Sequence, residues 1–141
     1  VLGHQKEIVE KIIGKNKKIK FIFNKDFENG IASSIKTGLN HLSEKTKAFF
    51  ICLGDMPMVN PNVYNQLIKS KDNKEIIVPI YKNQQGNPVL FSRSMKNKIM
   101  TIHGDVGAKK IINSNENKIL NIDINELGIT KDFNTKDNFN S

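Results

Sequence analysis

An aspartate directly follows one of the most apolar stretches of the chain. The run Ala48–Leu53 is continuously apolar, and Gly54 and Asp55 come next, shortly before Pro57. A carboxylate at the end of a buried segment is costly unless a cation or several hydrogen-bond donors compensate it. Such oxygens suit a hard cation such as Mg²⁺, which commonly takes one or two carboxylates together with phosphates. The alternative is an Asp-x-Pro turn in which Asp55 only caps the backbone.

Other reactive side chains give weaker signals. Cys52 lies inside the apolar run, which predicts a small core residue rather than a nucleophile. The histidines lack the spacing of a metal site, so we expect them at surface or capping positions; they are His4, His41 and His103. These residue types therefore leave Asp55 as the principal candidate for chemistry.

Length and composition bound the class of protein. A chain of 141 residues predicts a single domain spanning residues 1–141. No apolar run approaches the roughly 18 residues that cross a bilayer, so we expect no membrane partner. The single cysteine excludes an internal disulfide, and there is no signal-peptide pattern. Both features favour a cytoplasmic location.

The net charge of +8 raises the question of nucleic-acid binding. The densest group of lysines is Lys15, Lys17, Lys18 and Lys20, and no aromatic residue is interleaved among them. Single-strand platforms need such aromatic residues for base stacking. We therefore expect no nucleic-acid partner, whereas an anionic small substrate would use the same positive field.

Apolar periodicity predicts alternating helices and strands. Helical patterns cover 4–14, 33–42, 60–71, 93–102 and 107–114, and strand-like runs cover 19–24, 48–54, 75–81, 88–92 and 118–124. This alternation favours a mainly parallel, three-layer α/β/α sheet that holds the runs from 19, 48, 75 and 118. Such sheets bind ligands beyond the carboxyl ends of their strands, where Asp55 is expected.

Helix ends are marked by capping residues. Gly14 is a candidate C-cap, and Ser33 or Ser34 is a candidate N-cap for the helix that follows. Asn60 precedes Pro61, which suits the first position of a helix.

Five ordered stretches carry a family resemblance: "NKDFENGIASSIKTGLNHL", "LGDMPMV", "GNPVLFSRSM", "HGDVGAKKII" and "DFNTKDNF". Together they resemble the MobA-like nucleotidyltransferases, particularly the molybdenum cofactor cytidylyltransferase branch. The resemblance covers almost the whole chain. It implies an α/β, Rossmann-like, three-layer α/β/α nucleotidyltransferase fold of the GT-A-like type.

The resemblance also implies an activity. A nucleoside monophosphate, CMP from CTP in this branch, would pass to a phosphorylated acceptor such as the molybdopterin cofactor, releasing pyrophosphate. Mg²⁺ would be the cofactor, and a molybdoenzyme would be a further partner. Guanylyl, methylerythritol cytidylyl and sugar-phosphate nucleotidyltransferases share the fold and stay open as alternatives.

Site residues follow from matching the motifs position by position. The resemblance implies Asp55 as the catalytic residue and metal ligand, with Asn134 as the second metal ligand. The implied nucleotide-binding residues are Gly30, Ser33, Ser34 and Gly54. The implied acceptor-binding residues are Asn87, Pro88, Gly104, Asp105 and Gly107, although turn or helix-entry chemistry explains these types equally well.

The chain also departs from the family pattern. The glycine-rich loop that holds the triphosphate after the first strand is absent, so we expect an N-terminally truncated domain that lacks this strand and exposes apolar surface. Asn134 stands where the branch commonly has Asp, and Lys136 where it has Pro. A non-catalytic nucleotide- or cofactor-binding module is therefore the competing hypothesis. The enzyme hypothesis predicts that Asp55, Asn134 and Ser34 converge on one cleft.

Overall fold

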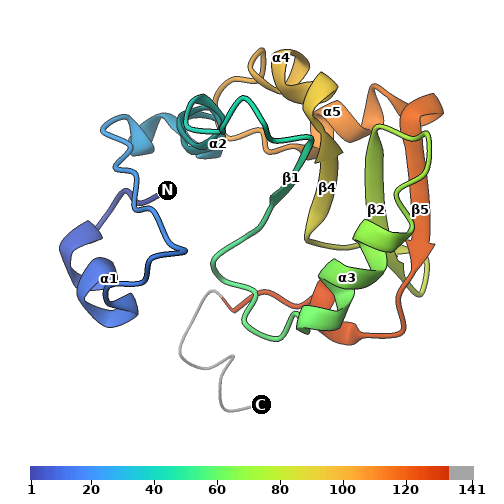
Figure 1. The fold of residues 1–141 in the computed structure, drawn as a ribbon, viewed down its shortest axis with the longest axis horizontal. Helices are drawn as coiled ribbons and strands as arrows, with labels where there is room; N and C mark the ends of the chain where they lie inside the picture. The colour runs from blue at the N-terminus through green and yellow to red at the C-terminus, as the bar shows by residue number, and fades with distance from the viewer. Residues whose placement is uncertain (134–141) are drawn as a thin grey trace. The chain divides into compact units, whose positions relative to one another are not determined.

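The structure, a computed structural model, describes residues 1–133 and divides them into two compact units. Unit 1 contains residues 1–46 and 96–114, and unit 2 contains residues 47–95 and the chain from 115 onward. Figure 1 shows the elements in order of colour along the chain. The expectation of a single domain over 1–141 stays a prediction.

Unit 1 is mainly helical. Its helices are α1 (Lys6–Ile13), α2 (Ile31–Asn40), α4 (Lys96–Ile99) and α5 (Lys109–Asn113), with a 3₁₀ turn, η1, at Phe27–Asn29. Gly14 ends α1, as expected, and its N–H donates to Glu10 O. No residue of α1 is buried, and Ile8, Ile12 and Ile13 are exposed. Helix α1 therefore exposes apolar side chains, while the expectation that truncation exposes an edge or apolar surface of the sheet stays a prediction.

The run 19–24 does not form the expected strand. It contributes only an isolated parallel bridge between Leu2 and Phe23, supported by backbone bonds from Leu2 N to Ile22 O and from Asn24 N to Leu2 O, both 2.8 Å. Ile19 and Phe23 are exposed, so these apolar residues have little packing to stabilise an extended ladder. The prediction that this run belongs to the main sheet is wrong.

Unit 2 is built on a five-stranded mixed sheet. The strands are β1 (Ala48–Ile51), β2 (Ile76–Tyr81), β3 (Gln84–Gln85), β4 (Val89–Ser92) and β5 (Ile119–Asp123). β4 is antiparallel to both β1 and β2, β3 is antiparallel to β2, and β5 is parallel to β2. The α/β class is confirmed, but the expectation of a mainly parallel sheet is wrong.

A two-residue turn explains the mixed sheet. Lys82 and Asn83 both have positive φ, 47° and 65°, which suits the tight turn of a hairpin. The chain therefore returns beside β2 as β3 and then β4, in the opposite direction. β1, β2 and β5 still point the same way, because β1 and β2 are each antiparallel to β4.

One face of this sheet packs on helix α3 (Pro61–Lys69) (Figure 1). Asn60 Oδ1 accepts a hydrogen bond from Asn62 N at 2.9 Å, which confirms Asn60 as the N-cap. The buried cluster on this face consists of Val63, Leu67, Ile77, Leu90, Ile124 and Ile129. Complete burial of a side chain of this size contributes about 1.5–3 kcal/mol, so the cluster fixes the helix on the sheet.

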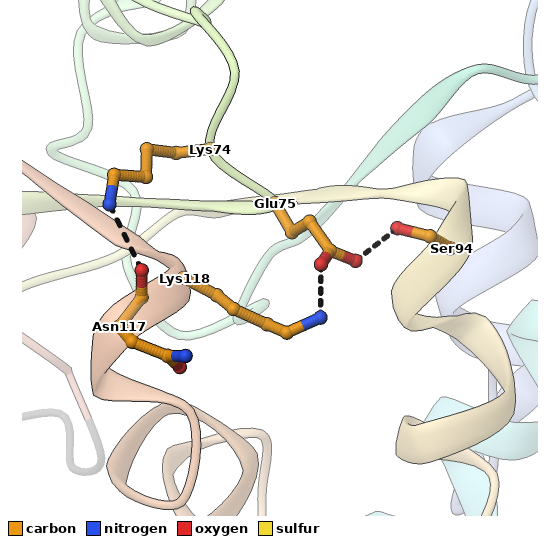
Figure 2. A network of polar contacts seen from close by, with 5 residues as sticks. All are labelled: Lys74, Glu75, Ser94, Asn117 and Lys118. Carbon is orange, nitrogen blue, oxygen red and sulfur yellow. Dashed lines mark hydrogen bonds and ion pairs between the residues drawn. The ribbon is translucent and has the colours of Figure 1, made fainter.

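A polar network joins the amino ends of β2 and β5 (Figure 2). Glu75, directly before β2, accepts hydrogen bonds from the Lys118 ammonium and from the Ser94 hydroxyl. Lys74 Nζ donates to Asn117 O at 2.9 Å. This network lies at the end of the sheet opposite to the carboxyl ends of β1, β2 and β5. We therefore interpret it as structural.

None of the helices among residues 1–133 has the length and apolar character needed to cross a membrane.

Candidate functional site

Asp55 lies beyond the carboxyl end of β1, as the sequence predicts. Its Oδ1 is buried and has no hydrogen-bond partner among the described residues. Leaving a buried acceptor unsatisfied costs about 1–3 kcal/mol, and more for a charged group. A capping aspartate would accept a backbone N–H through its side chain. Among residues 1–133, Oδ1 accepts from no backbone N–H, whereas the backbone carbonyl of Asp55 accepts from Phe133 N at 2.8 Å.

The same edge of the sheet carries Asn87 and Pro88. β4 pairs with β1 in a register that places Val89 opposite Ile51, so the residues before β4 lie at the carboxyl end of β1. The Asn87–Pro88 peptide bond is cis, and Pro88 is fully buried. Asn87 N donates to Ile129 O at 2.8 Å. Asn87 is therefore the more accessible of the two.

The segment 127–133 runs along this edge in close contact with the backbone. A Cβ at Gly128 would lie 2.2 Å from Met58 O, and a Cβ at Gly86 would lie 2.7 Å from Ile129 O. Glycine is required at both points because no side chain fits there. The segment therefore leads past Asn87 toward Asp55, where Phe133 makes its backbone hydrogen bond.

The donor set at Asp55 fits a hard cation. A buried carboxylate oxygen without a hydrogen bond is a free ligand, and Mg²⁺ characteristically uses few protein carboxylates. No group of three or more His, Cys, Asp or Glu residues suited to a metal occurs within residues 1–133. Asn134, the second predicted ligand, lies outside the described residues.

In unit 1, the turn around Gly104 caps helix α2. Asp105 Oδ1 accepts from Ile31 N at 3.3 Å, and Gly104 O accepts from Ala32 N at 3.2 Å. Gly30, with φ 91°, allows the close approach, because a Cβ there would lie 2.5 Å from the carbonyl of Gly104. The prediction that Ser33 or Ser34 is the N-cap is wrong, since a distant turn supplies the cap.

A buried asparagine holds the two serines. Asn24 is 3% exposed, and its Nδ2 donates to Ser33 Oγ at 2.8 Å and to Ser34 Oγ at 3.0 Å. Its Oδ1 accepts from Asp26 N at 3.0 Å and lies 3.4 Å from Thr37 Oγ1. These hydrogen bonds fix the positions of the two hydroxyls, and Ser33 Oγ donates in turn to Asp26 O or Gly30 O, each at 2.8 Å.

The predicted site residues thus form two groups. Gly54, Asp55, Asn87 and Pro88 belong to unit 2, whereas Gly30, Ser33, Ser34, Gly104, Asp105 and Gly107 belong to unit 1. Within unit 1, contacts join Gly30 to Gly104 and Ile31 to Asp105, although these residues are far apart in sequence. The convergence of Asp55 with Ser34 stays a prediction.

The sequence did not identify three polar residues whose side-chain hydrogen bonds the structure shows near α2: Asn24, Lys36 and His103. Asn24 follows an apolar run, the same signal that identified Asp55, but that run was assigned only as a strand. Lys36 Nζ donates to His103 Nδ1 at 3.3 Å across 67 positions of sequence, and no local pattern predicts such a pair.

Cys52 is exposed, so its expected place in the core is wrong. It follows β1, which lies at one edge of the sheet. Partial desolvation raises the pKa of the Cys52 thiol, and a hydrogen bond from Tyr64 Oη at 3.8 Å acts in the opposite direction. The pKa of Tyr64 is raised to about 12, mainly by desolvation and to a smaller extent by the contact with Cys52.

Comparison with known families gives this geometry its context. Residues 1–119 match the model of the MobA-like NTP transferase domain. The chain belongs to the MobA-like NTP transferase family. The matched range contains Asp55, both serines and the Gly104 turn, so the two groups of site residues lie inside the family domain.

One curated relative of this MobA-like chain is a probable molybdenum cofactor guanylyltransferase from Methanosarcina mazei. It is 27% identical over 95 residues, which cover 64% of this chain and 42% of the relative. The chain thus spans less than half of the length of that protein.

Two solved structures show the same fold. The manganese complex of Rv0371c from Mycobacterium tuberculosis has a TM-score of 0.82 and 23% identity, over 99% of this chain and 73% of that one. The bifunctional IspDF of Campylobacter jejuni has a TM-score of 0.73 and 16% identity, over 95% of this chain and 38% of that one. These likenesses confirm the α/β Rossmann-like nucleotidyltransferase fold.

Proposed function

We propose that the protein transfers a nucleoside monophosphate from a nucleoside triphosphate to a phosphorylated acceptor and releases pyrophosphate. The observation that carries this proposal is the buried, unpartnered Oδ1 of Asp55 at the carboxyl edge of the sheet, in a chain that belongs to the MobA-like family. A carboxylate left in this condition needs a cation, and phosphoryl transfer depends on the neutralisation of phosphate charge.

Asp55 would hold the divalent metal, with Asn134 as the second ligand. Mg²⁺ is the metal we propose, and the manganese complex of the Mycobacterium tuberculosis protein supports a divalent ion of this kind. When bound, the ion would supply positive charge that neutralises the phosphates of the donor. The backbone hydrogen bond from Phe133 N to Asp55 O connects the segment 127–133 to the loop that follows β1.

Unit 1 would bind the nucleotide through the helix α2 region. Asn24 holds both serine hydroxyls; that of Ser33 donates to Asp26 O or Gly30 O, so the Ser34 hydroxyl is the one we propose donates to the ligand, with Gly30 shaping the turn beside it. Gly54 would complete this set from unit 2. Gly104, Asp105 and Gly107, with Asn87 and Pro88, would serve the acceptor. The carboxylate of Asp105 also caps α2, so this residue has a structural role as well.

For the donor and acceptor we propose CTP and the molybdenum cofactor, with a molybdoenzyme as a later partner. GTP is the second candidate donor, because the Methanosarcina mazei relative is named as a guanylyltransferase. We propose a cytoplasmic location on the basis of the sequence. A non-catalytic binding module remains the competing proposal, since the chain spans 42% of that relative.

The test is donor-dependent release of pyrophosphate by the protein at its natural length. The protein is incubated with Mg²⁺, the molybdopterin acceptor and either CTP or GTP, and pyrophosphate is measured over time. We expect release that requires the acceptor, with CTP at least about tenfold more effective than GTP in kcat/KM, about 1.4 kcal/mol. Higher efficiency with GTP would replace the cytidylyl proposal, and no release with any nucleoside triphosphate would favour the binding module.

A further inference from the structure

Asn24 is a buried polar residue whose side chain reaches two hydroxyl groups of helix α2. It is 3% exposed, and its backbone N–H donates to Leu2 O at 2.8 Å, which fixes the residue beside the bridge at the start of the chain. A buried amide needs partners for both its oxygen and its nitrogen. The direction of each hydrogen bond that Asn24 makes therefore determines what its neighbours can still donate.

A backbone group fixes which way the Asn24 amide points. The N–H of Asp26 lies 3.0 Å from Oδ1, and a backbone N–H can only donate, so the atom that faces it is the oxygen. Thr37 Oγ1 donates to the same oxygen at 3.4 Å. The amide nitrogen therefore faces the hydroxyls of Ser33 and Ser34, at 2.8 and 3.0 Å. Because an amide nitrogen only donates, neither serine can give its proton to Asn24.

The two serines differ in where their protons go. Ser33 Oγ lies 2.8 Å from both Asp26 O and Gly30 O, so its proton is used within the protein. Among residues 1–133, Ser34 Oγ accepts from Asn24 and donates to no protein group. Ser34 is only half-buried. Its hydroxyl is thus held by one hydrogen bond and retains a proton for which the described protein has no acceptor.

We infer that Asn24 is a positioning residue that keeps the Ser34 proton for the nucleotide, so that Ser34 selects a nucleotide atom with a free lone pair. The inference rests on the proposed nucleotidyl transfer and deepens it, because it assigns the specificity of one contact to a residue behind the site. A carboxylate at position 24 would have nearly the same shape, but its oxygens would accept from both serines. The Ser34 proton would then point inward, and the nucleotide would meet the Ser34 oxygen instead.

The test is calorimetric titration of the protein at its natural length with CTP and, separately, with GTP, each with Mg²⁺ at pH 8. We expect Asn24→Asp to weaken binding of the preferred nucleotide by about tenfold or more. In a Ser34→Ala background the same substitution should cost at most about threefold, because no Ser34 proton remains to be redirected. This comparison separates the direction of the hydrogen bond from repulsion between the added charge and the phosphates, which would act in both backgrounds.

Asn16→Asp is the matched control for the added charge. Asn16 is exposed in unit 1, and its Oδ1 accepts from Lys18 N at 2.9 Å, a hydrogen bond that aspartate also accepts. This variant should bind the nucleotide like the unmodified protein. An equal loss of affinity in Asn16→Asp and Asn24→Asp, or an equal cost of Asn24→Asp with Ser34 and with Ala at that position, would overturn the inference.

Asn24→Ala gives a readout that a purely structural role would reverse. It leaves the Ser34 hydroxyl free to rotate toward the ligand, so it should bind the nucleotide more tightly than Asn24→Asp does. If Asn24 only supported the fold, the nearly isosteric aspartate would be the better replacement. Thermal unfolding of each variant shows whether a loss of affinity is a loss of fold, and if Asn24→Ala does not fold, the comparison in the two Ser34 backgrounds decides.

Pyrophosphate release by the unmodified protein separates this inference from the proposed function. Release together with equal costs of Asn24→Asp in the two backgrounds would overturn the inference and leave the proposed transfer in place. Nucleotide binding with the expected difference between backgrounds, but without release, would support the role of Asn24 and overturn the transfer. Absence of binding of both CTP and GTP would overturn both.

Discussion

Individual residues of the same type have different tasks in this protein because their surroundings differ. The carboxylate of Asp105 accepts the N–H of Ile31 and completes a helix end. The buried oxygen of Asp55 accepts nothing among the described residues. The first carboxylate has a structural role in capping α2, whereas we propose that the second holds a cation.

The single cysteine gives a residue-scale prediction about pH. Desolvation raises the pKa of Cys52 in the folded protein, so the thiolate fraction near pH 8 is smaller than in the unfolded chain. We expect folded Cys52 to react more slowly with iodoacetamide, with the midpoint of its rate-against-pH curve above that of urea-unfolded protein. Because the folded pKa is raised, this group stabilises the fold below the unfolded pKa, and that contribution is lost as pH rises through the folded pKa.

Tyr64→Phe is the companion variant for this measurement. Its hydroxyl donates to Cys52 Sγ and lowers the pKa of the thiol, so its removal should move the midpoint further upward. A midpoint equal to that of the unfolded chain, or a downward shift in Tyr64→Phe, would contradict this description of Cys52.

The position of Asp55 beyond the carboxyl end of β1 was predictable from the sequence, because an apolar run ends shortly before it. Lys36 and His103 were not, since their contact depends on bringing together α2 and a turn 67 positions later. Cys52 was misplaced for a related reason. An apolar run does not reveal that its strand lies at a sheet edge, where the residue after the strand is exposed.

At the scale of elements, the contact between the start of α2 and the turn at Gly104 can be tested by substitution of Gly30. A Cβ at Gly30 would lie 2.5 Å from the Gly104 carbonyl, and φ is 91°. We expect Gly30→Ala to lower the free energy of unfolding by about 2 kcal/mol or more, through strain and loss of the two cap hydrogen bonds. Urea unfolding measures this change.

Gly14→Ala is the matched control for that variant. Gly14 also has positive φ, 71°, but a Cβ there would meet nothing within 4 Å. Its cost should be limited to backbone strain, about 1 kcal/mol. Equal effects of the two substitutions would show that the contact with Gly104 does not determine the requirement for glycine at position 30.

Element types were more predictable than their directions. The apolar patterns located α1, α3 and the strands β2, β4 and β5 because periodicity and capping residues are local properties. The mixed sheet depends on the positive φ of Lys82 and Asn83; asparagine tolerates this conformation, but the lysine before it gives no such signal. The failure of the run 19–24 as a strand reflects missing packing partners, which are not local either.

At the scale of the whole molecule, the proposed function divides between two units. Unit 1 holds the serines and their buried asparagine, and unit 2 holds Asp55. Most of the net charge of +8 lies in unit 1, where Lys and Arg clearly outnumber Asp and Glu, so the positive field that favours phosphorylated ligands belongs mainly to that unit. We propose that the protein requires the charge of Asp55 rather than its shape.

Replacement of Asp55 by Asn in the protein at its natural length tests that claim most directly. Asn keeps the shape and the capping ability but loses the charge that holds a divalent cation. Asp72→Asn, an exposed position before β2, removes the same charge elsewhere and is the matched control. Pyrophosphate release with Mg²⁺, donor and acceptor should fall about 100-fold or more in Asp55→Asn, about 2.7 kcal/mol, with unchanged thermal unfolding. Near-normal release in Asp55→Asn, equal to that of Asp72→Asn, would contradict the account and leave Asp55 as a turn residue.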